Sequence, residues 1–241
     1  MRDRERGWTI LEVLIVLALV GLLLALALPN FHAVRIRNDE AAAIRGLHEV
    51  ARAQNLFRAA ALVDEDSDGR GEYALLQELS GDQNPRSYAG RSGAGGGAPP
   101  VPLPQFRLKA APDGDYEVCG YRFRLLLPSA TGAGVREAGG GSAVRVDPRL
   151  AAAVWCVYAW PVRREGFIPA ATGQRAFFAN QAGEVLGAGG EYAAIPAREG
   201  DPARAPEPGA AFQGSGPLGT ITGAPAMGTL GRDGLVWRVV K

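Results

Sequence analysis

Two hydrophobic patterns divide the first sixty residues of the chain. From Ile10 to Leu28 nearly every residue is apolar, and Glu12 is the one charged side chain in this run. At a rise of about 1.5 Å per residue, a helix of this length measures about 28 Å, close to the thickness of the hydrocarbon core of a bilayer. Residues 8–30 are therefore predicted to form a transmembrane helix, and Pro29 predicts a kink or local melting between Ala25 and Pro29.

From residue 31 to residue 62 the chain stays compatible with a helix, but its apolar residues are confined to one stripe. The members of the stripe are separated by three, four or seven positions, and they are Ile44, Leu47, Val50, Phe57 and Ala61. Charged residues largely take the other faces, as in an amphipathic helix. The pattern predicts that residues 31–62 continue the same helix and pack against a globular domain.

Beyond residue 62, short apolar stretches alternate with loops, in agreement with 33 Gly and 17 Pro in 241 residues. Strands are predicted at residues 105–109, 115–127, 153–160, 175–179, 184–186 and 235–240. The alternation in the second of these slips by one position at Cys119-Gly120, which predicts a bulge. The continuously apolar residues 153–160 predict a central strand, and Asn180 to Gly183 predicts a hairpin turn.

The fold class predicted by these elements is α+β. One long N-terminal helix packs on an antiparallel sheet of about five or six strands, which belongs to a globular domain of residues 63–241. A short helix is expected from Glu72 to Ser80, ended by Gly81. Residues 196–233 are rich in proline and glycine without periodicity, and we expect an extended or mobile segment there.

The apolar run follows a short charged segment, and its one carboxylate has a defined place in it. Residues 1–7 contain three arginines and end in Gly7; Trp8 and Thr9 follow, and Glu12 is the fifth residue counted from Trp8. A carboxylate within a membrane helix costs about 2.5–3.5 kcal/mol on insertion scales. We therefore interpret Glu12 as a functional residue.

These residues resemble the class III signal of type IV prepilins and of type II secretion pseudopilins, and Pro29 stands where many pilins carry a helix-bending proline. The resemblance covers residues 2–30 and extends to about residue 62. It implies that a prepilin peptidase removes the leader, residues 1–7, by cutting between Gly7 and Trp8, and methylates the new amine of Trp8. It also implies that Glu12 pairs with the Trp8 amine of a neighbouring subunit, which neutralises both charges and sets the register of a filament.

The resemblance further implies a structural subunit of a type IV pilus or a type II secretion pseudopilus, rather than an enzyme. Its partners would be other pilin or pseudopilin subunits, prepilin peptidase, a cytoplasmic assembly ATPase, an inner-membrane platform protein and membrane lipid. The leader arginines favour a cytoplasmic leader on a single-pass inner-membrane protein, with the globular domain periplasmic or extracellular.

Two other interpretations of the N-terminus stay open. The apolar run suits a plain signal anchor, and Ala25-Leu26-Ala27 offers a cleavage site for ordinary signal peptidase. Either interpretation would suit a signal-anchored or secreted calcium-binding module that stays monomeric.

Alternating aspartates follow the predicted long helix. The residues from Asp64 to Gly69 match the first half of an EF-hand calcium loop, but the twelfth loop position is Leu75 instead of a bidentate glutamate. The loop is therefore no complete EF-hand, and an acidic, solvated turn is the alternative to a truncated calcium site. The ligands predicted for Ca²⁺ are the carboxylates of Asp64, Asp66, Asp68 and Glu72 and the backbone carbonyl of Arg70.

Composition and the absence of catalytic motifs narrow the classes of function that we expect. The net charge is +1 and the basic residues are scattered, so no nucleic-acid partner is implied. Cys119 and Cys156 in an exported domain predict one disulfide, with two buried free thiols as the alternative. The chain has two histidines and no G-x-S-x-G, H-E-x-x-H or C-x-x-C motif, so we do not expect an enzyme.

Overall fold

The computed structural model describes residues 8–82, 85–86, 109–110, 114–136, 146–164, 170–171, 173–189 and 205–240. The side chains of residues 24–30, 32, 109–110, 163–164 and 170–171 are not described. The predicted leader up to Gly7, the side chain of Pro29 and most of the strand predicted at residues 105–109 therefore lie outside the described residues.

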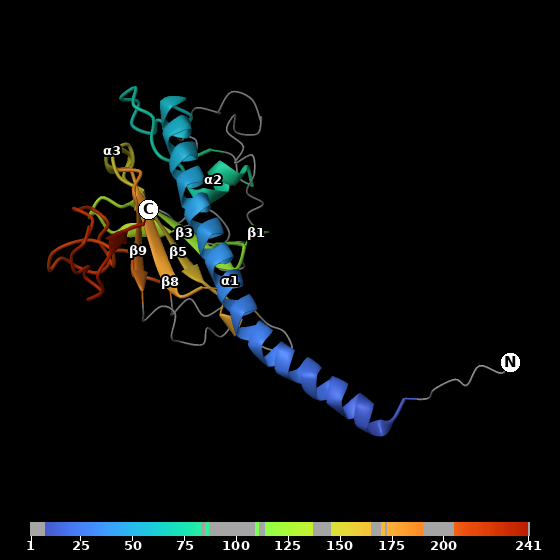
Figure 1. Cartoon of the computed structure of the whole chain (residues 1–241). Coiled ribbons are helices and arrows are strands. Elements are labelled where there is room, and N and C mark those ends of the chain that lie inside the picture. Colours follow the sequence, from blue (N-terminus) through green and yellow to red (C-terminus); the bar gives the residue numbers. More distant parts are fainter. Residues whose placement is uncertain are drawn as a thin grey trace.

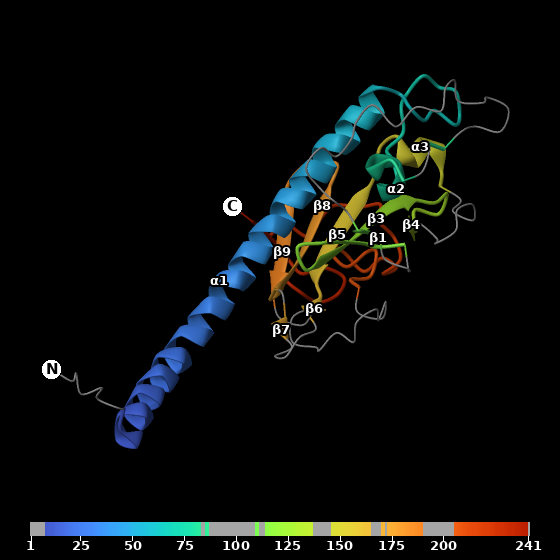
Figure 2. The ribbon, with the colours of Figure 1, turned by 90° about the vertical axis from the view of Figure 1, so that its right-hand side faces the viewer.

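One long helix, α1 (Ile10–Ala59), forms the N-terminal part of the structure. Its C-terminal part crosses the sheet, and its N-terminal part projects from the globular unit, bending as it leaves (Figures 1 and 2). The backbone stays helical through Pro29, so the predicted local melting is wrong. A bend absorbs the clash and the missing hydrogen bond of a proline without breaking the helix. Within the described residues, we find no helix long and apolar enough to cross a membrane.

Among the described residues, eight strands form the main sheet, and every pairing between them is antiparallel. Its order is β1-β2-β3-β5-β8-β9-β10, and β4 pairs with β3 beside this path. The strands are β1 (Lys109–Ala110), β2 (Tyr116–Val118), β3 (Tyr121–Pro128), β4 (Gly134–Arg136), β5 (Cys156–Pro161), β8 (Arg175–Asn180), β9 (Val185–Gly189) and β10 (Arg238–Val239). The remaining elements are a separate pair, β6 (Arg163–Arg164) with β7 (Ala170–Ala171), and the helices α2 (Leu76–Ser80) and α3 (Pro148–Ala151).

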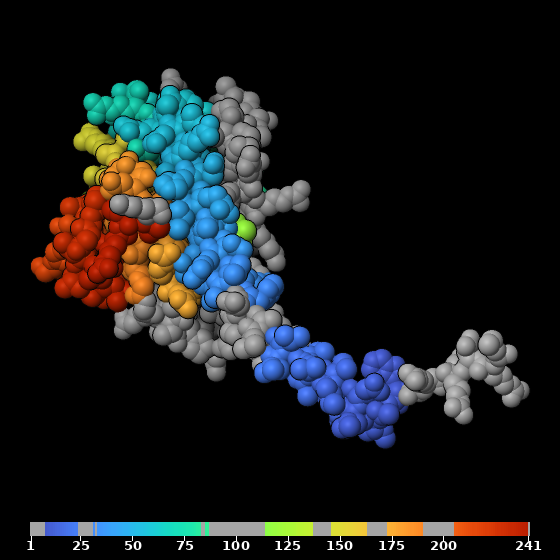
Figure 3. Space-filling view, viewed as in Figure 1, coloured from blue at the N-terminus to red at the C-terminus, as the bar shows by residue number. Residues whose placement is uncertain are grey.

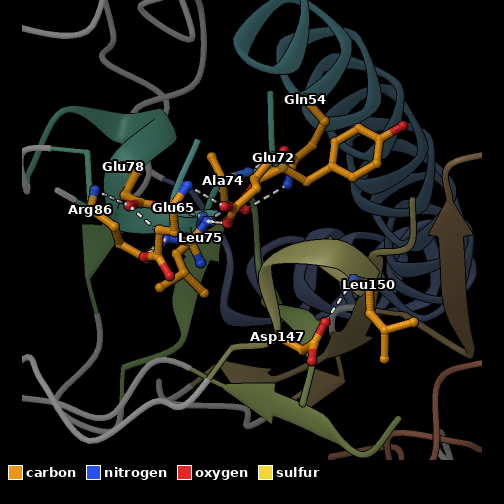
Figure 4. Close-up of polar contacts among 10 residues, drawn as sticks. Gln54, Glu65, Glu72, Ala74, Leu75, Glu78, Arg86, Asp147 and Leu150 are labelled. Carbon is orange, nitrogen blue, oxygen red and sulfur yellow. Dashed lines mark hydrogen bonds and ion pairs between the residues drawn. The ribbon is translucent and has the colours of Figure 1, made fainter. Parts of the chain in front are cut away.

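The predicted α+β arrangement of a helix on an antiparallel sheet is confirmed. Strand β5 lies between β3 and β8, and all six of its residues are buried, as expected for a central strand. The hairpin between β8 and β9 is also confirmed, since Gly183 N–H donates to the Asn180 carbonyl at 2.9 Å. Helix α3 begins at Pro148, and the carboxylate of its N-cap residue Asp147 accepts the Leu150 N–H at 2.9 Å (Figure 4).

The sheet carries a separate core on each face. On one face, α1 contributes Leu47, Val50 and Phe57, which pack with Phe123 and Phe177 of the sheet. On the other face, the C-terminal residues 205–240 cover the sheet, as the red segment opposite α1 in Figures 1 and 2 shows. Four aromatic rings of this second core form pairs whose centres lie 5.1–6.2 Å apart, those of Tyr158, Phe178, Phe212 and Trp237.

The prediction of an extended or mobile segment at residues 196–233 is wrong for its described part, residues 205–233. Phe212, Ile221 and Ala226 are at most 1% exposed there. Arg232 also ties the turns together, because its guanidinium donates to the carbonyls of Pro217 and Thr220. Such side-chain and turn hydrogen bonds satisfy the backbone without a ladder, and this packing has no periodic signature in the sequence.

A two-residue turn replaces the bulge predicted at Cys119-Gly120. Val118 of β2 lies opposite Tyr121 of β3, so the two strands form a hairpin. The φ angles of Cys119 and Gly120 are 48° and 78°. Positive φ at both central residues is what a type I′ turn requires. Such a turn changes the phase of the apolar and polar alternation along the sequence, and a bulge would change it too.

The predicted disulfide between Cys119 and Cys156 does not form, and both cysteines are free. Cys119 is exposed in the β2–β3 turn, whereas Cys156 is buried in β5 opposite Leu126. From Tyr121, next to the turn, to Leu126 the strand advances about 17 Å at about 3.3 Å per residue. A disulfide needs Cα atoms within about 7 Å, so the strand register keeps the two thiols apart.

Helix α2 is shorter than predicted. It begins at Leu76 instead of Glu72 and ends as expected at Gly81, which has a φ of 82°. Residues 71–75 are extended because the backbone N–H and C=O of Ala74 both bond to the side chain of Gln54 on α1. A helix over these residues would need the same groups for its own hydrogen bonds.

Candidate functional site

The first turn of α1 is closed by reciprocal hydrogen bonds between Thr9 and Glu12. The Glu12 N–H donates to Thr9 Oγ1 at 3.2 Å, and the Thr9 N–H donates to Glu12 Oε2 at 3.3 Å. This is a capping box, and the carboxylate also lies at the positive end of the helix dipole. Our sequence analysis missed it, although the T-x-x-E spacing of residues 9–12 is its signal.

The projecting part of α1 presents an apolar surface on all sides. Every residue from Trp8 to Leu23 is exposed, and the large apolar side chains among them are 44–83% exposed. Figure 3 shows this part standing clear of the globular unit. Continuous exposed apolar surface marks a site that binds protein or lipid. Glu12 is the one charged residue within it, so the assembly residue predicted from the sequence lies at the tip of an exposed apolar helix.

The docked part of α1 buries a stripe with alternating spacings of three and four. Its buried residues are Glu40, Ala43, Leu47, Val50, Gln54 and Phe57. Leu47, Val50 and Phe57 confirm the predicted stripe, whereas Ala61 is exposed because the helix ends at Ala59. Glu40 and Gln54 were not predicted to be buried. Each stands seven residues from Leu47, and this spacing is the signal that would have found them.

The three aspartates of the acidic loop converge. One carboxylate oxygen from each of Asp64, Asp66 and Asp68 lies within 4.8 Å of the others. Backbone groups hold them in place, because Asp68 N–H and Gly69 N–H donate to Asp64, each at 3.1 Å. Gly69 has a φ of 81°, which permits the tight bend. The arrangement offers a hard cation several oxygen ligands at one point.

Arginines surround the same loop. The side chain of Arg70 lines a hollow beside Asp66 and Asp68, together with Arg58, Arg149 and two alanines. Arg149 Nε lies 4.0 Å from Asp66, and its side chain is 88% exposed. Cationic groups so close compete with a metal ion for the aspartates, so any cation bound here would be held weakly.

Glu72 does not join the aspartates. Its carboxylate is buried, accepts the Glu65 N–H at 2.7 Å and lies 3.4 Å from Arg86 Nη2. Arg86 also lies 3.4 Å from Glu78 and 3.8 Å from Glu65, so three carboxylates share one guanidinium (Figure 4). Burial is the largest cause that raises the pKa of Glu72 and of Glu78 above their ordinary value, although Arg86 opposes it.

Two comparisons with known proteins find similarity over part of the chain. Residues 2–28 match the family described as the prokaryotic N-terminal methylation motif. The chain is also similar to the type IV major pilin protein PilA of Myxococcus xanthus (strain DK1622), with 39% identity over 54 residues. The chain is thus similar to type IV pilins over part of its length, which supports the family expected from Gly7, Trp8 and Glu12.

The pilin-like similarity is local. It covers 22% of this chain and 24% of the Myxococcus protein, so the chain spans about a quarter of the length of the curated relative that it matches. No solved structure matches the chain. The family match bears on the N-terminal part of α1 alone.

Proposed function

We propose that this pilin-like protein is a structural subunit assembled through α1 into a type IV pilus or a type II secretion pseudopilus. A prepilin peptidase cuts between Gly7 and Trp8 and methylates the Trp8 amine. The observation that carries the proposal is the projecting half of α1, which exposes apolar side chains on all faces and a single carboxylate, Glu12. A lone subunit leaves this surface without a protein partner, and a bundle of such helices buries it.

Before assembly, residues 8–30 lie in the inner membrane, with the leader on the cytoplasmic side and the globular unit outside. The apolar run from Ile10 to Leu28 supports this placement. The capping box lowers the free-energy cost of placing Glu12 in lipid, because the carboxylate accepts a hydrogen bond at the N-terminus of its own helix. The assembly ATPase, the platform protein and the prepilin peptidase are the partners that this cycle requires.

During assembly, Glu12 pairs with the Trp8 amine of a neighbouring subunit. Both hydrogen bonds from Thr9 reach Oε2, and Oε1 accepts none from the described residues. The carboxylate can therefore keep its cap and still receive an amine. A buried ion pair contributes little net stability, but it penalises every register that leaves one charge unpaired.

The experiment compares three variants in the native host by measuring subunits in the filament fraction and in the membrane. Glu12→Ala removes the carboxylate and keeps the bond from the backbone N–H of residue 12 to Thr9 Oγ1, and we expect normal cleavage without assembly. Thr9→Ala removes Oγ1 from the capping box and keeps the carboxylate, and we expect filaments. Glu184→Ala, in an exposed turn, controls for loss of a surface charge. Filaments of Glu12→Ala at the wild-type level would refute the proposal, and a wild-type protein that stays monomeric would favour the anchored calcium-binding module.

We also propose that the acidic loop binds Ca²⁺ weakly through Asp64, Asp66 and Asp68, with the backbone carbonyl of Arg70 as a further ligand. The convergence of the three carboxylates supports this proposal. Glu72 is left out, because its carboxylate is bonded to Glu65 and Arg86. With three carboxylates, no bidentate glutamate and arginines nearby, the expected affinity is that of extracellular modules, about 10⁻⁴–10⁻³ M.

A further inference from the structure

The projecting helix leaves the sheet at Glu40. Among the described side chains of α1, Glu40 is the first from the N-terminus to be buried, and Phe31 and Val34 before it are 65% and 53% exposed. Glu40 therefore lies where the helix leaves the sheet, and Ile36 and Asp39 before it are half-buried. About 45 Å of helix extends from there to Ile10 at about 1.5 Å per residue.

Glu40 is held by the start of strand β8 on both of its carboxylate oxygens. Oε2 accepts from Arg175 Nη2 at 2.7 Å and from Arg175 Nε at 3.0 Å, and Oε1 accepts the Gln174 N–H at 3.0 Å. Arg175 is fixed in turn, since its guanidinium lies 5.2 Å from the centre of the Phe177 ring. Tyr121 of β3 donates to the Arg175 carbonyl at 3.2 Å.

This contact differs in kind from the apolar packing of α1 against the sheet. Leu47, Val50 and Phe57 hold the helix by apolar packing, which has no preferred direction. Two guanidinium N–H groups on Oε2 and a backbone N–H on Oε1 fix the orientation of the carboxylate as well as its distance. Because the projecting helix is about 45 Å long, a change of about 10° in its tilt at Glu40 moves Ile10 by about 8 Å.

We propose that Glu40 and Arg175 are positioning residues that set the angle between the projecting helix and the sheet. The angle decides how the globular unit is oriented when the apolar halves of the helices pack together. The consequence for assembly rests on the proposed function, whereas the angle itself does not.

The chain offers a matched control within the sheet. Arg124 of β3 makes a bidentate pair with Asp115, with both contacts at 2.7 Å, and lies 5.1 Å from the centre of the Trp160 ring. Each of the two arginines thus donates two guanidinium N–H groups to one carboxylate and lies over an aromatic ring, Arg124 on both oxygens of Asp115 and Arg175 on one oxygen of Glu40, but of the two only Arg175 bonds to α1. Arg175→Gln and Arg124→Gln remove comparable interactions and differ in whether the helix is held.

The test measures the helix angle by pulsed electron paramagnetic resonance between two spin labels on the full chain in detergent micelles. One label is on Glu184→Cys, and the other is on Val34→Cys or on Leu19→Cys, before Pro29. The background carries Cys119→Ser, and Cys156 is too deeply buried to be labelled. We expect Arg175→Gln to shift or broaden the distances to both helix labels, and Arg124→Gln to leave both unchanged.

Unchanged distances in Arg175→Gln would overturn the inference, and so would a change at Leu19 without one at Val34, because the movement would then lie at Pro29. In the native host, we expect Arg175→Gln to be cleaved normally and to lose filament assembly. If the wild type forms no filaments, the proposed function fails, and the distances still decide whether Glu40 and Arg175 set the angle.

Discussion

Gln54 and Ala74 are joined by two hydrogen bonds of 2.8 Å, one from Gln54 Nε2 to the Ala74 carbonyl and one from the Ala74 N–H to Gln54 Oε1. The side-chain amide of Gln54 is fully buried, and it makes the two backbone hydrogen bonds that a neighbouring strand would otherwise make with Ala74 (Figure 4). The pair fastens the extended segment after the acidic loop to the last turns of α1, so the loop is fixed at both ends.

Replacing this amide should cost stability. Gln54→Leu keeps the volume but leaves a buried N–H and a buried carbonyl without partners, at about 1–3 kcal/mol each. We expect the free energy of unfolding in urea to fall by about 2–5 kcal/mol. Asn55→Leu, on the exposed face of the same turn, should change it by less than about 0.5 kcal/mol. A Gln54→Leu variant as stable as the control would show that the two bonds contribute nothing.

A substitution in the β2–β3 turn should increase the stability of the protein. Cys119 has a φ of 48°, which strains most side chains, and Asn-Gly is the preferred sequence for a type I′ turn. Cys119→Asn should therefore raise the free energy of unfolding by about 0.5–1 kcal/mol, in the range seen for favourable turn substitutions. Cys119→Ala, which does not favour this conformation, should bring no gain. A loss of about 2 kcal/mol or more in both variants would contradict this account, because it would show that the Cys119 side chain itself stabilises the turn.

The carboxylates around Arg86 predict how stability depends on pH. Burial raises the pKa of Glu72 and Glu78 above 4.5, so the folded chain binds more protons than the unfolded chain between 4.5 and the raised values. Their contribution to stability is therefore fully present below pH 4.5 and is lost as pH rises through the raised pKa. Glu72→Gln keeps the shape and removes one such group. Urea unfolding between pH 4.5 and 7 should show a smaller loss of stability with pH in this variant, and an unchanged dependence would contradict the account.

Calcium should stabilise the globular unit if the aspartates bind it. A ligand present at ten times its dissociation constant raises the free energy of unfolding by about 1.4 kcal/mol. We expect millimolar Ca²⁺ to raise the melting temperature of the wild type, and EDTA to reverse the rise. Asp66→Asn should lose most of the effect. Equal shifts with Mg²⁺, or in the Asp66→Asn variant, would mean that the loop is only an acidic turn.

The sequence was sufficient for elements whose signal is local. The spacing of Leu47, Val50 and Phe57 identified the docked face of α1, and the unbroken apolar run at β5 identified the central strand. The turn at Cys119-Gly120 was located but misinterpreted, because a bulge and a two-residue hairpin turn both shift the alternation. Only the pairing of Val118 with Tyr121 distinguishes them.

The features that were missed depend on partners far away in the sequence. Glu40 pairs with Arg175, and Gln54 forms hydrogen bonds with Ala74. The sequence around Glu40 and around Gln54 does not indicate these partners. The packing of residues 205–240 is of the same kind, since irregular turns become ordered only against the face of a finished sheet. The candidate assembly site was predictable because Trp8, Glu12 and the apolar run are contiguous.

The measurement that tests the central claim most directly is the intact mass and N-terminal peptide of the protein purified from its native membrane. We predict a chain that begins at Trp8 with a methylated amine, because the leader ends at Gly7 and residues 2–28 match the N-terminal methylation motif. A chain that begins at Leu28, after an ordinary signal peptidase cut, would contradict the account, since Glu12 and the projecting helix would be lost. An uncut chain beginning at Met1 would contradict it equally and would leave a signal-anchored protein.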